Sequence, residues 1–118
     1  MSDHRKEERR KIMSFTPVYD VDKNVLLGYI GDLTLQGALV IGEKPVEINN
    51  QIILAIDFPE TSEFPARRVE LPARVAWSKR EPDAEYYDTG IEFHNISEQN
   101  REIIEAILAR YQYRRVSP

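Results

Sequence analysis

Cysteine is absent from this 118-residue chain, which excludes disulfide bonds and thiolate metal sites. No apolar run approaches the roughly 18 residues that a membrane-spanning helix needs, and the charged amino end lacks the apolar stretch of a signal peptide. His4 and His94 are the only histidines, and neither has a second ligand at metal-binding spacing. Nucleophile elbows, Walker loops and Rossmann glycine patterns are also missing. We therefore expect a cytoplasmic protein that is not an enzyme and holds no metal or cofactor.

The net charge of −4 is unevenly distributed along the chain. Residues 1–12 carry a net +2 and residues 110–118 carry +3, so the intervening stretch carries −9. An acidic body argues against general nucleic-acid binding, which needs a broad basic face. The basic ends leave room for one local anion site at a terminus. The alternative is that both ends are solvated tails.

Alternation of apolar and polar residues predicts six short strands. They occupy residues 15–21, 25–33, 38–41, 51–58, 69–77 and 87–93. The first two are expected to form a hairpin around a turn signal at residues 22–24. Pro72 lacks a backbone N–H, so the fifth run is expected to be an edge strand or to contain a bulge.

After residue 93 the period changes from 2 to 3.6, which predicts a helix over about 97–113 with Ser97 as its N-cap. Six strands followed by one helix predict a mainly β fold. We expect a small six-stranded antiparallel split barrel with a C-terminal helix. A flexible basic arm of residues 1–12 would precede a single domain of residues 13–115.

Two short motifs carry the chemistry that the sequence offers. Arg5 and Arg9 form an R-x-x-x-R pair, and Arg10 adds positive potential beside them. Residues 32–37 read D-L-T-L-Q-G, with Asp32, Thr34 and Gly37 at the key positions. Arginine offers a planar fork of donors to phosphate or to the O6/N7 edge of guanine, and a carboxylate accepts from N–H groups that guanine also presents.

Each motif also has a purely structural interpretation. The arginines can belong to a solvated arm without a partner. Asp32 and Thr34 can satisfy local backbone donors, with Gly37 supplying a positive-φ turn. The arginine pair also has a second register, because Lys6 and Arg10 share the spacing. Arg5 and Arg9 are preferred because lysine cannot form the bidentate fork.

In their order and spacing the two motifs resemble those of the PilZ family, which binds cyclic di-GMP through R-x-x-x-R and [D/N]-x-S-x-x-G. The sequences V-A-W at residues 75–77 and G-I-E-F at 90–93 extend the resemblance. The resemblance implies that cyclic di-GMP is bound by Arg5, Arg9, Arg10, Asp32, Thr34 and Gly37. Thr34 stands where the family most often has serine, which keeps the hydroxyl but stiffens the side chain.

The resemblance also implies a function, that of a stand-alone bacterial cyclic di-GMP receptor. Its arm would become ordered on binding the dinucleotide, and it would signal to an unidentified protein partner with a motility, biofilm or virulence output. No DNA or RNA polymer and no membrane insertion is expected. The main alternative is a PilZ-like adaptor in pilus or motility assembly that binds no nucleotide. A small enzyme that uses the acidic body has no positive support.

Overall fold

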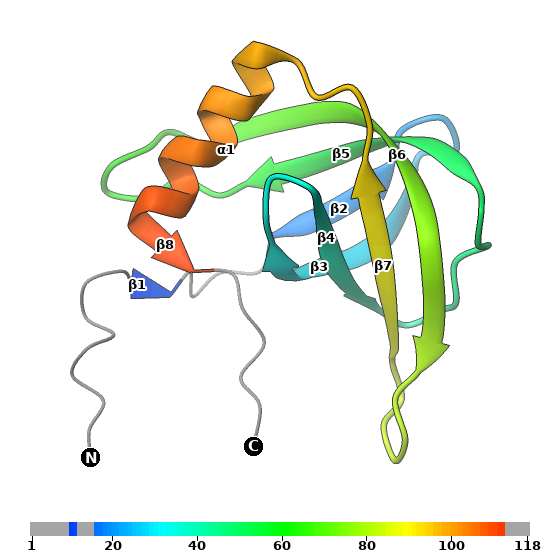
Figure 1. The fold of residues 1–118 in the computed structure, drawn as a ribbon. Coiled ribbons are helices and arrows are strands. Elements are labelled where there is room, and N and C mark those ends of the chain that lie inside the picture. Colours follow the sequence, from blue (N-terminus) through cyan, green and yellow to red (C-terminus); the bar gives the residue numbers. More distant parts are fainter. Residues whose placement is uncertain (1–9, 12–15, 113–118) are drawn as a thin grey trace.

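The computed structural model describes Arg10–Lys11 and residues 16–112; residues 1–9, 12–15 and 113–118 lie outside the described part. Within this described part, the chain forms eight strands and one helix (Figure 1). The elements are β1 (Arg10–Lys11), β2 (Pro17–Asp20), β3 (Val25–Leu33), β4 (Gly37–Gly42), β5 (Gln51–Phe58), β6 (Arg67–Arg80), β7 (Tyr87–Phe93), α1 (Glu98–Arg110) and β8 (Tyr111–Gln112).

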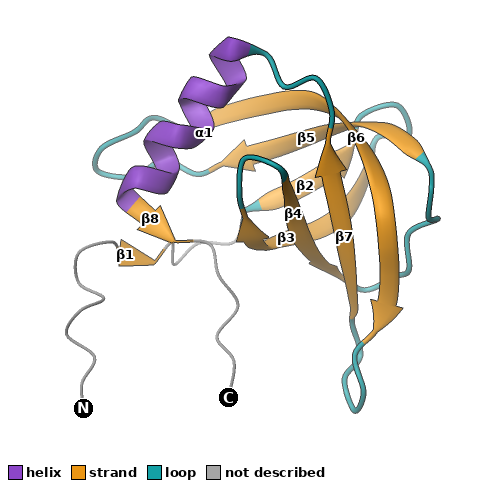
Figure 2. Cartoon of the chain, in the orientation of Figure 1, coloured by secondary structure: helices purple, strands orange, loops and turns teal. Residues whose placement is uncertain are grey.

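Strands β2 to β7 close into a barrel in the order β2-β3-β4-β7-β6-β5 (Figure 2). Every neighbouring pair in this barrel is antiparallel. The expected six-stranded antiparallel barrel with a C-terminal helix is therefore confirmed. Strands β1 and β8 form a separate parallel pair that the sequence did not suggest.

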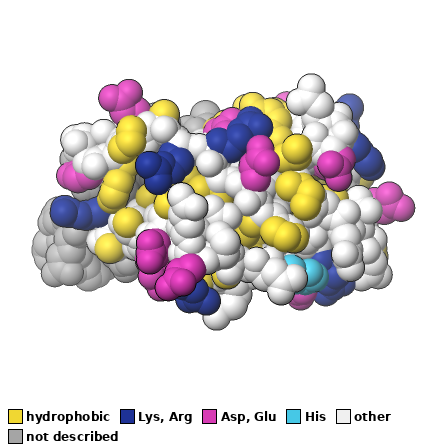
Figure 3. Space-filling view, turned by 90° about the horizontal axis from the view of Figure 1, so that it is seen from above, with side chains coloured by type: hydrophobic (Ala, Val, Ile, Leu, Met, Phe, Trp, Pro, Cys, Tyr) yellow, Lys and Arg dark blue, Asp and Glu magenta, His cyan; other side chains and the backbone are white. Residues whose placement is uncertain are grey.

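The alternating apolar residues point into the barrel and form its core. The side chains of Val18, Leu54, Ile56 and Val75 have no exposed surface, and each stabilises the fold by about 1.5–3 kcal/mol through burial. Figure 3 shows that other hydrophobic side chains reach the outer surface between charged ones.

Helix α1 extends this core along β6. Its buried residues Ile104 and Ile107 join the hydrophobic cluster, and the Asn100 side chain donates to the Glu70 carbonyl at 3.0 Å. Ser97 accepts a hydrogen bond from the Asn100 backbone at 3.1 Å, which confirms it as the N-cap.

The helix ends earlier than the expected limit of residue 113. After Arg110 the chain becomes extended, because Tyr111 pairs with Arg10 and Gln112 pairs with Lys11. Of the expected flexible arm, residues 1–12, only Arg10–Lys11 lie within the described part, so its flexibility stays a prediction. In the described residues, no helix is long and apolar enough to span a bilayer.

Pro72 does not mark an edge strand, because β6 lies between β5 and β7. The other expectation, a bulge in this run, is met between Val75 and Trp77 rather than at Pro72 itself. Pro72 pairs with Ile53 on β5 and directly precedes Ala73, the first β6 residue that pairs with β7. Its carbonyl accepts from the His94 backbone at 2.9 Å. A proline is tolerated here because the β7 ladder ends at this point and needs no donor from residue 72.

Candidate functional site

The turn between β3 and β4 is closed by hydrogen bonds of Thr34. Its backbone N–H donates to the Gly37 carbonyl at 2.9 Å, and its hydroxyl oxygen accepts from the Gln36 backbone at 3.1 Å. A side-chain oxygen that accepts from residue i+2 mimics a backbone turn and fixes its shape. The exposed Thr34 side chain therefore already has a structural role at this turn.

Gly37 is needed for a reason other than the expected one. It does not have a positive φ; among the glycines in the described residues, only Gly28 does. Instead, β7 approaches so closely that a Cβ at residue 37 would overlap the Ile91 carbonyl oxygen. The expectation of a positive-φ turn at Gly37 is wrong, and the close approach of two paired backbones is the cause.

Asp32 lies two residues before this turn on the half-buried part of β3. A bulge between Ile30 and Asp32 shifts the register, so that Asp32 lies opposite Leu39 on β4. One carboxylate oxygen of Asp32 accepts from the Leu33 backbone at 3.0 Å. Because a carboxylate has about four acceptor positions, this local bond leaves capacity for further donors.

Asp32 begins a row of residues that are paired across neighbouring strands, and this row ends at Trp77. Leu39 pairs with Gly90 on β7, and Gly90 pairs with Trp77 on β6. The indole covers Gly90, since a Cβ there would lie 2.9 Å from Cζ2 of Trp77 and closer still to Nε1 and Cε2. With 45% of Trp77 exposed, the surface carries a carboxylate at one end and a flat aromatic ring at the other.

Trp77 belongs to the V-A-W pattern at residues 75–77 but is not among the expected site residues. Its position follows from two bulges, one between Ile30 and Asp32 and one between Val75 and Trp77. Bulges shift the register in a way that alternation alone does not reveal. The one available signal was a glycine, Gly90, in an otherwise bulky strand, which marks a close approach.

A second row of paired residues starts at Gly37, and its charged side chains, Glu92 and Arg74, already form an ion pair with each other. Gly37 lies opposite Glu92, and Glu92 lies opposite Arg74. The Arg74 guanidinium is 3.1 Å from the Glu92 carboxylate and donates to the Asn49 side chain at 2.6 Å. A phosphate bound at this turn would therefore need cations from another part of the chain.

A second polar cluster lies on β5 and β6. Arg68 donates two hydrogen bonds to Asp57, at 2.6 and 3.0 Å, and lies 5.4 Å from the centre of the Tyr19 ring. The hydrogen bond to Asp57 raises the pKa of Arg68 above its usual value. In the part of the chain that the structure describes, no cluster of three His, Cys, Asp or Glu residues could hold a metal.

The structure thus brings together Asp32, Thr34 and Gly37 of the expected site. Arg5 and Arg9 lie outside the described residues, and their contact with the turn stays a prediction. The backbone of Arg10 is placed in β1, opposite Tyr111 of β8.

Comparisons with known proteins agree with this architecture. The family model for the PilZ domain matches residues 3–110. Among solved structures, the chain is similar to the Bacillus subtilis inhibitor of motility (MotI/DgrA), with a TM-score of 0.62 and 14% sequence identity over 80% of this chain and 44% of that chain. The chain therefore spans less than half of that protein chain, and the likeness establishes the fold alone. A search of curated proteins finds no match.

Proposed function

Because the chain belongs to the PilZ domain family, a family of cyclic di-GMP receptors, we propose that it binds cyclic di-GMP beside the turn of residues 32–37. In this proposal the bound protein acts on a separate protein partner in the cytoplasm and catalyses no reaction. Because a motility inhibitor has a similar fold, we include a motility output in the proposal.

The observation that carries the proposal is the row from Asp32 to Trp77. The Asp32 carboxylate can accept from the N–H groups of guanine. The exposed indole of Trp77 offers a face on which a purine can stack, a contact worth about 1–3 kcal/mol per base. Leu39 and Gly90 lie between them and carry no charge, and because the indole covers Gly90, a base would contact the ring rather than the strand.

The phosphates require a cation source, because Arg74 is already paired with Glu92. In our proposal Arg5, Arg9 and Arg10 supply it. Each bidentate arginine–phosphate contact contributes about 1.5–3 kcal/mol when the ligand excludes water. Closure of the arm over the dinucleotide would change the surface that a partner contacts.

Calorimetry with cyclic di-GMP tests the proposal. Asp32→Ala and Arg9→Ala are each expected to weaken binding at least tenfold, while Glu105→Gln on the exposed face of α1 serves as a matched control and leaves the Kd unchanged. Since Trp77 is the only tryptophan, its fluorescence should change on titration. Absence of binding, or binding that neither Asp32→Ala nor Arg9→Ala weakens, would contradict the proposed site.

One observation favours a second candidate function, that of an adaptor without nucleotide. The hydroxyl of Thr34 and one oxygen of Asp32 are both used in local hydrogen bonds, which a turn needs even when nothing binds. This function is supported if cyclic di-GMP produces no heat in calorimetry while the protein still retains a partner in a pull-down.

A further inference from the structure

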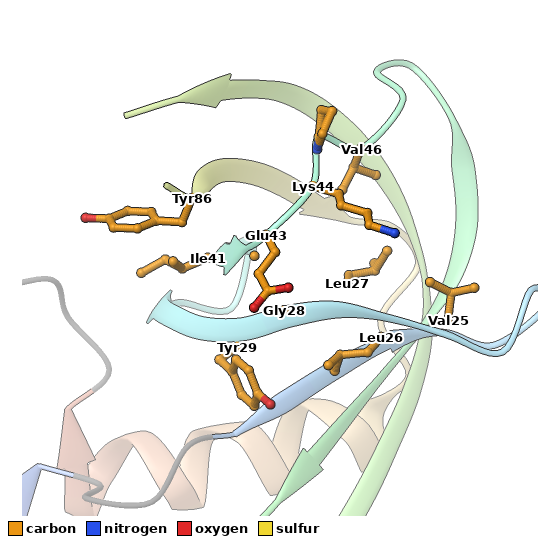
Figure 4. Close-up of a pocket in the computed structure, with 12 residues that line it drawn as sticks. Val25, Leu26, Leu27, Gly28, Tyr29, Ile41, Glu43, Lys44, Val46 and Tyr86 are labelled. Carbon is orange, nitrogen blue, oxygen red and sulfur yellow. The ribbon is translucent and has the colours of Figure 1, made fainter. Parts of the chain in front are cut away.

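Exposed hydrophobic side chains gather around one cavity on the outside of the barrel. Among the described residues, six large hydrophobic side chains are exposed, and four of them line a cavity of about 550 Å³. The four are Val25, Leu26, Tyr29 and Tyr86. We call this cavity the β3 pocket (Figure 4). Exposed apolar side chains that cluster in this way mark interaction surfaces.

Hydrogen bonds hold two walls of the β3 pocket in place. The Val46 backbone donates to the Ser78 hydroxyl at 3.2 Å, which fastens the segment after β4 to β6. The Glu81 backbone donates to the Tyr86 carbonyl at 3.2 Å and closes the loop that presents Tyr86. A pocket whose walls are already fixed loses less entropy when something binds to it.

Two charged side chains line the β3 pocket, Glu43 and Lys44, and they have opposite signs. Both are exposed, and within the described residues no hydrogen bond or ion pair involves either side chain. Figure 4 shows the Glu43 carboxylate directed toward Gly28 and the Lys44 ammonium directed away from it. A partner with charges of a single sign would attract one of these groups and repel the other, whereas a surface that carries both signs can match both.

We propose that the β3 pocket is the surface through which two copies of this chain associate. A two-fold axis brings the same patch of each copy together, so that every contact occurs twice. Glu43 of one copy then faces Lys44 of the second copy, and Lys44 faces the second copy's Glu43. Tyr86 at the rim of each pocket packs against Leu26 and Tyr29 of the other copy.

The closed barrel makes side chains the means of this association. Each of the strands β2 to β7 has two neighbours, so the barrel offers no free strand edge that could pair with another chain. The four exposed side chains of the pocket are 38–47% exposed. They provide less than the roughly 800 Å² per partner of a standard interface, so we expect a reversible dimer with a Kd in the micromolar range.

Exchange of the charges at Glu43 and Lys44 tests this inference. Sedimentation equilibrium of the full chain measures the Kd of the dimer, without cyclic di-GMP and in about 0.15 M salt, which screens general repulsion. Glu43→Lys places two lysines at the pocket and Lys44→Glu places two glutamates, so each variant is expected to self-associate at least about fivefold more weakly. The double variant Glu43→Lys with Lys44→Glu should restore the parent Kd. An equimolar mixture of the two single variants should associate more tightly than either variant alone.

Matched controls separate this contact from a general effect of net charge. Glu105→Lys and Arg101→Glu change the net charge by the same amounts at an exposed ion pair on α1 that does not line the pocket, and they should leave the Kd unchanged. Tyr86→Ser should weaken the dimer, while Tyr86→Phe keeps the ring and should retain it. Thermal melts verify that each variant is folded.

Dilution of the isotope-labelled chain, followed by NMR, locates the surface. Resonances of residues 25–29, 41–46 and 86 should shift with protein concentration, and those of α1 should stay in place. Concentration-dependent shifts centred on α1 would overturn the inference.

Three further results would also overturn it. They are a monomeric mass up to about 1 mM, control variants that change the Kd as much as the pocket variants, and single variants whose mixture associates no better than each alone. A monomer in which cyclic di-GMP shifts the resonances of Leu26 and Tyr86 would assign the pocket to the nucleotide instead. The inference goes beyond the proposed function and does not depend on it. A dimer with the expected charge effects and no nucleotide binding would support the inference and contradict only the nucleotide proposal.

Discussion

Alanine substitution at Gly37 and at Gly90 should have very different costs, although both glycines lie on paired barrel strands. At Gly37 the added Cβ meets the Ile91 carbonyl oxygen, which is backbone. At Gly90 it meets the Trp77 indole, which is 45% exposed and can rotate away. The two substitutions therefore differ in whether the added methyl group meets fixed backbone or a movable side chain.

The loss of unfolding free energy at Gly37 depends on how far the β7 backbone must move to admit the added Cβ. Overpacking against a fixed neighbour costs about 1–3 kcal/mol, and separating β4 from β7 weakens the bond from the Phe93 backbone to the Gln36 carbonyl, 2.9 Å long, for about 1 kcal/mol more. We expect Gly37→Ala to lower the free energy of unfolding by about 2–4 kcal/mol. At roughly 4 °C per kcal/mol for a domain of this size, the Tm falls by about 8–16 °C. Gly90→Ala should cost about 1 kcal/mol or less, because the strand gains from replacing glycine.

Urea denaturation followed by circular dichroism measures both values, with an unchanged m-value as the check that the unfolded states are comparable. Tryptophan fluorescence adds a second readout, since Gly90→Ala should displace the indole and shift its emission while Gly37→Ala should not do so directly. A Gly37→Ala protein within 0.5 kcal/mol of the parent, or a larger loss for Gly90→Ala, would refute the reasoning.

Three further predictions concern the fold. Ser97→Ala removes the N-cap bond of α1 and should lower the unfolding free energy by about 1 kcal/mol in thermal or urea denaturation. Leu54→Ala opens a cavity where the side chain is fully buried and should cost about 2–5 kcal/mol in the same assay; a loss below 1 kcal/mol would contradict its place in the core. Thr34→Val keeps the shape but removes the hydroxyl bond to the Gln36 backbone, so it should cost about 0.5–1.5 kcal/mol, whereas Thr34→Ser should be nearly neutral by chemical denaturation.

The barrel strands and the helix were predictable because their signals are local. Alternation placed inward residues such as Leu54 and Val75 correctly, and Ser97 marked the start of the helix. These patterns depend on neighbours within a few residues, where periodicity is strongest.

The parts that could not be predicted depend on distant pairings. That β4 pairs with β7 rather than with β5 is a property of barrel closure, and no alternation pattern encodes it. The bulges before Asp32 and Trp77 add one residue each to a strand, so the row that joins these two side chains could not be found from spacing. Two-residue strands such as β1 carry too few residues for any periodic signal.

The pairing of β1 with β8 has a consequence for the order in which the molecule forms and opens. Arg10 and Tyr111 are about 100 residues apart, and closing such a loop in the unfolded chain costs roughly 4 kcal/mol. Two residue pairs cannot offset this entropy cost alone, so they form only after the barrel and α1 have brought β1 and β8 together. Their amide hydrogens should then exchange with solvent well before those of Leu54. Strand β1 can therefore separate from β8 and pair with it again while the barrel stays folded.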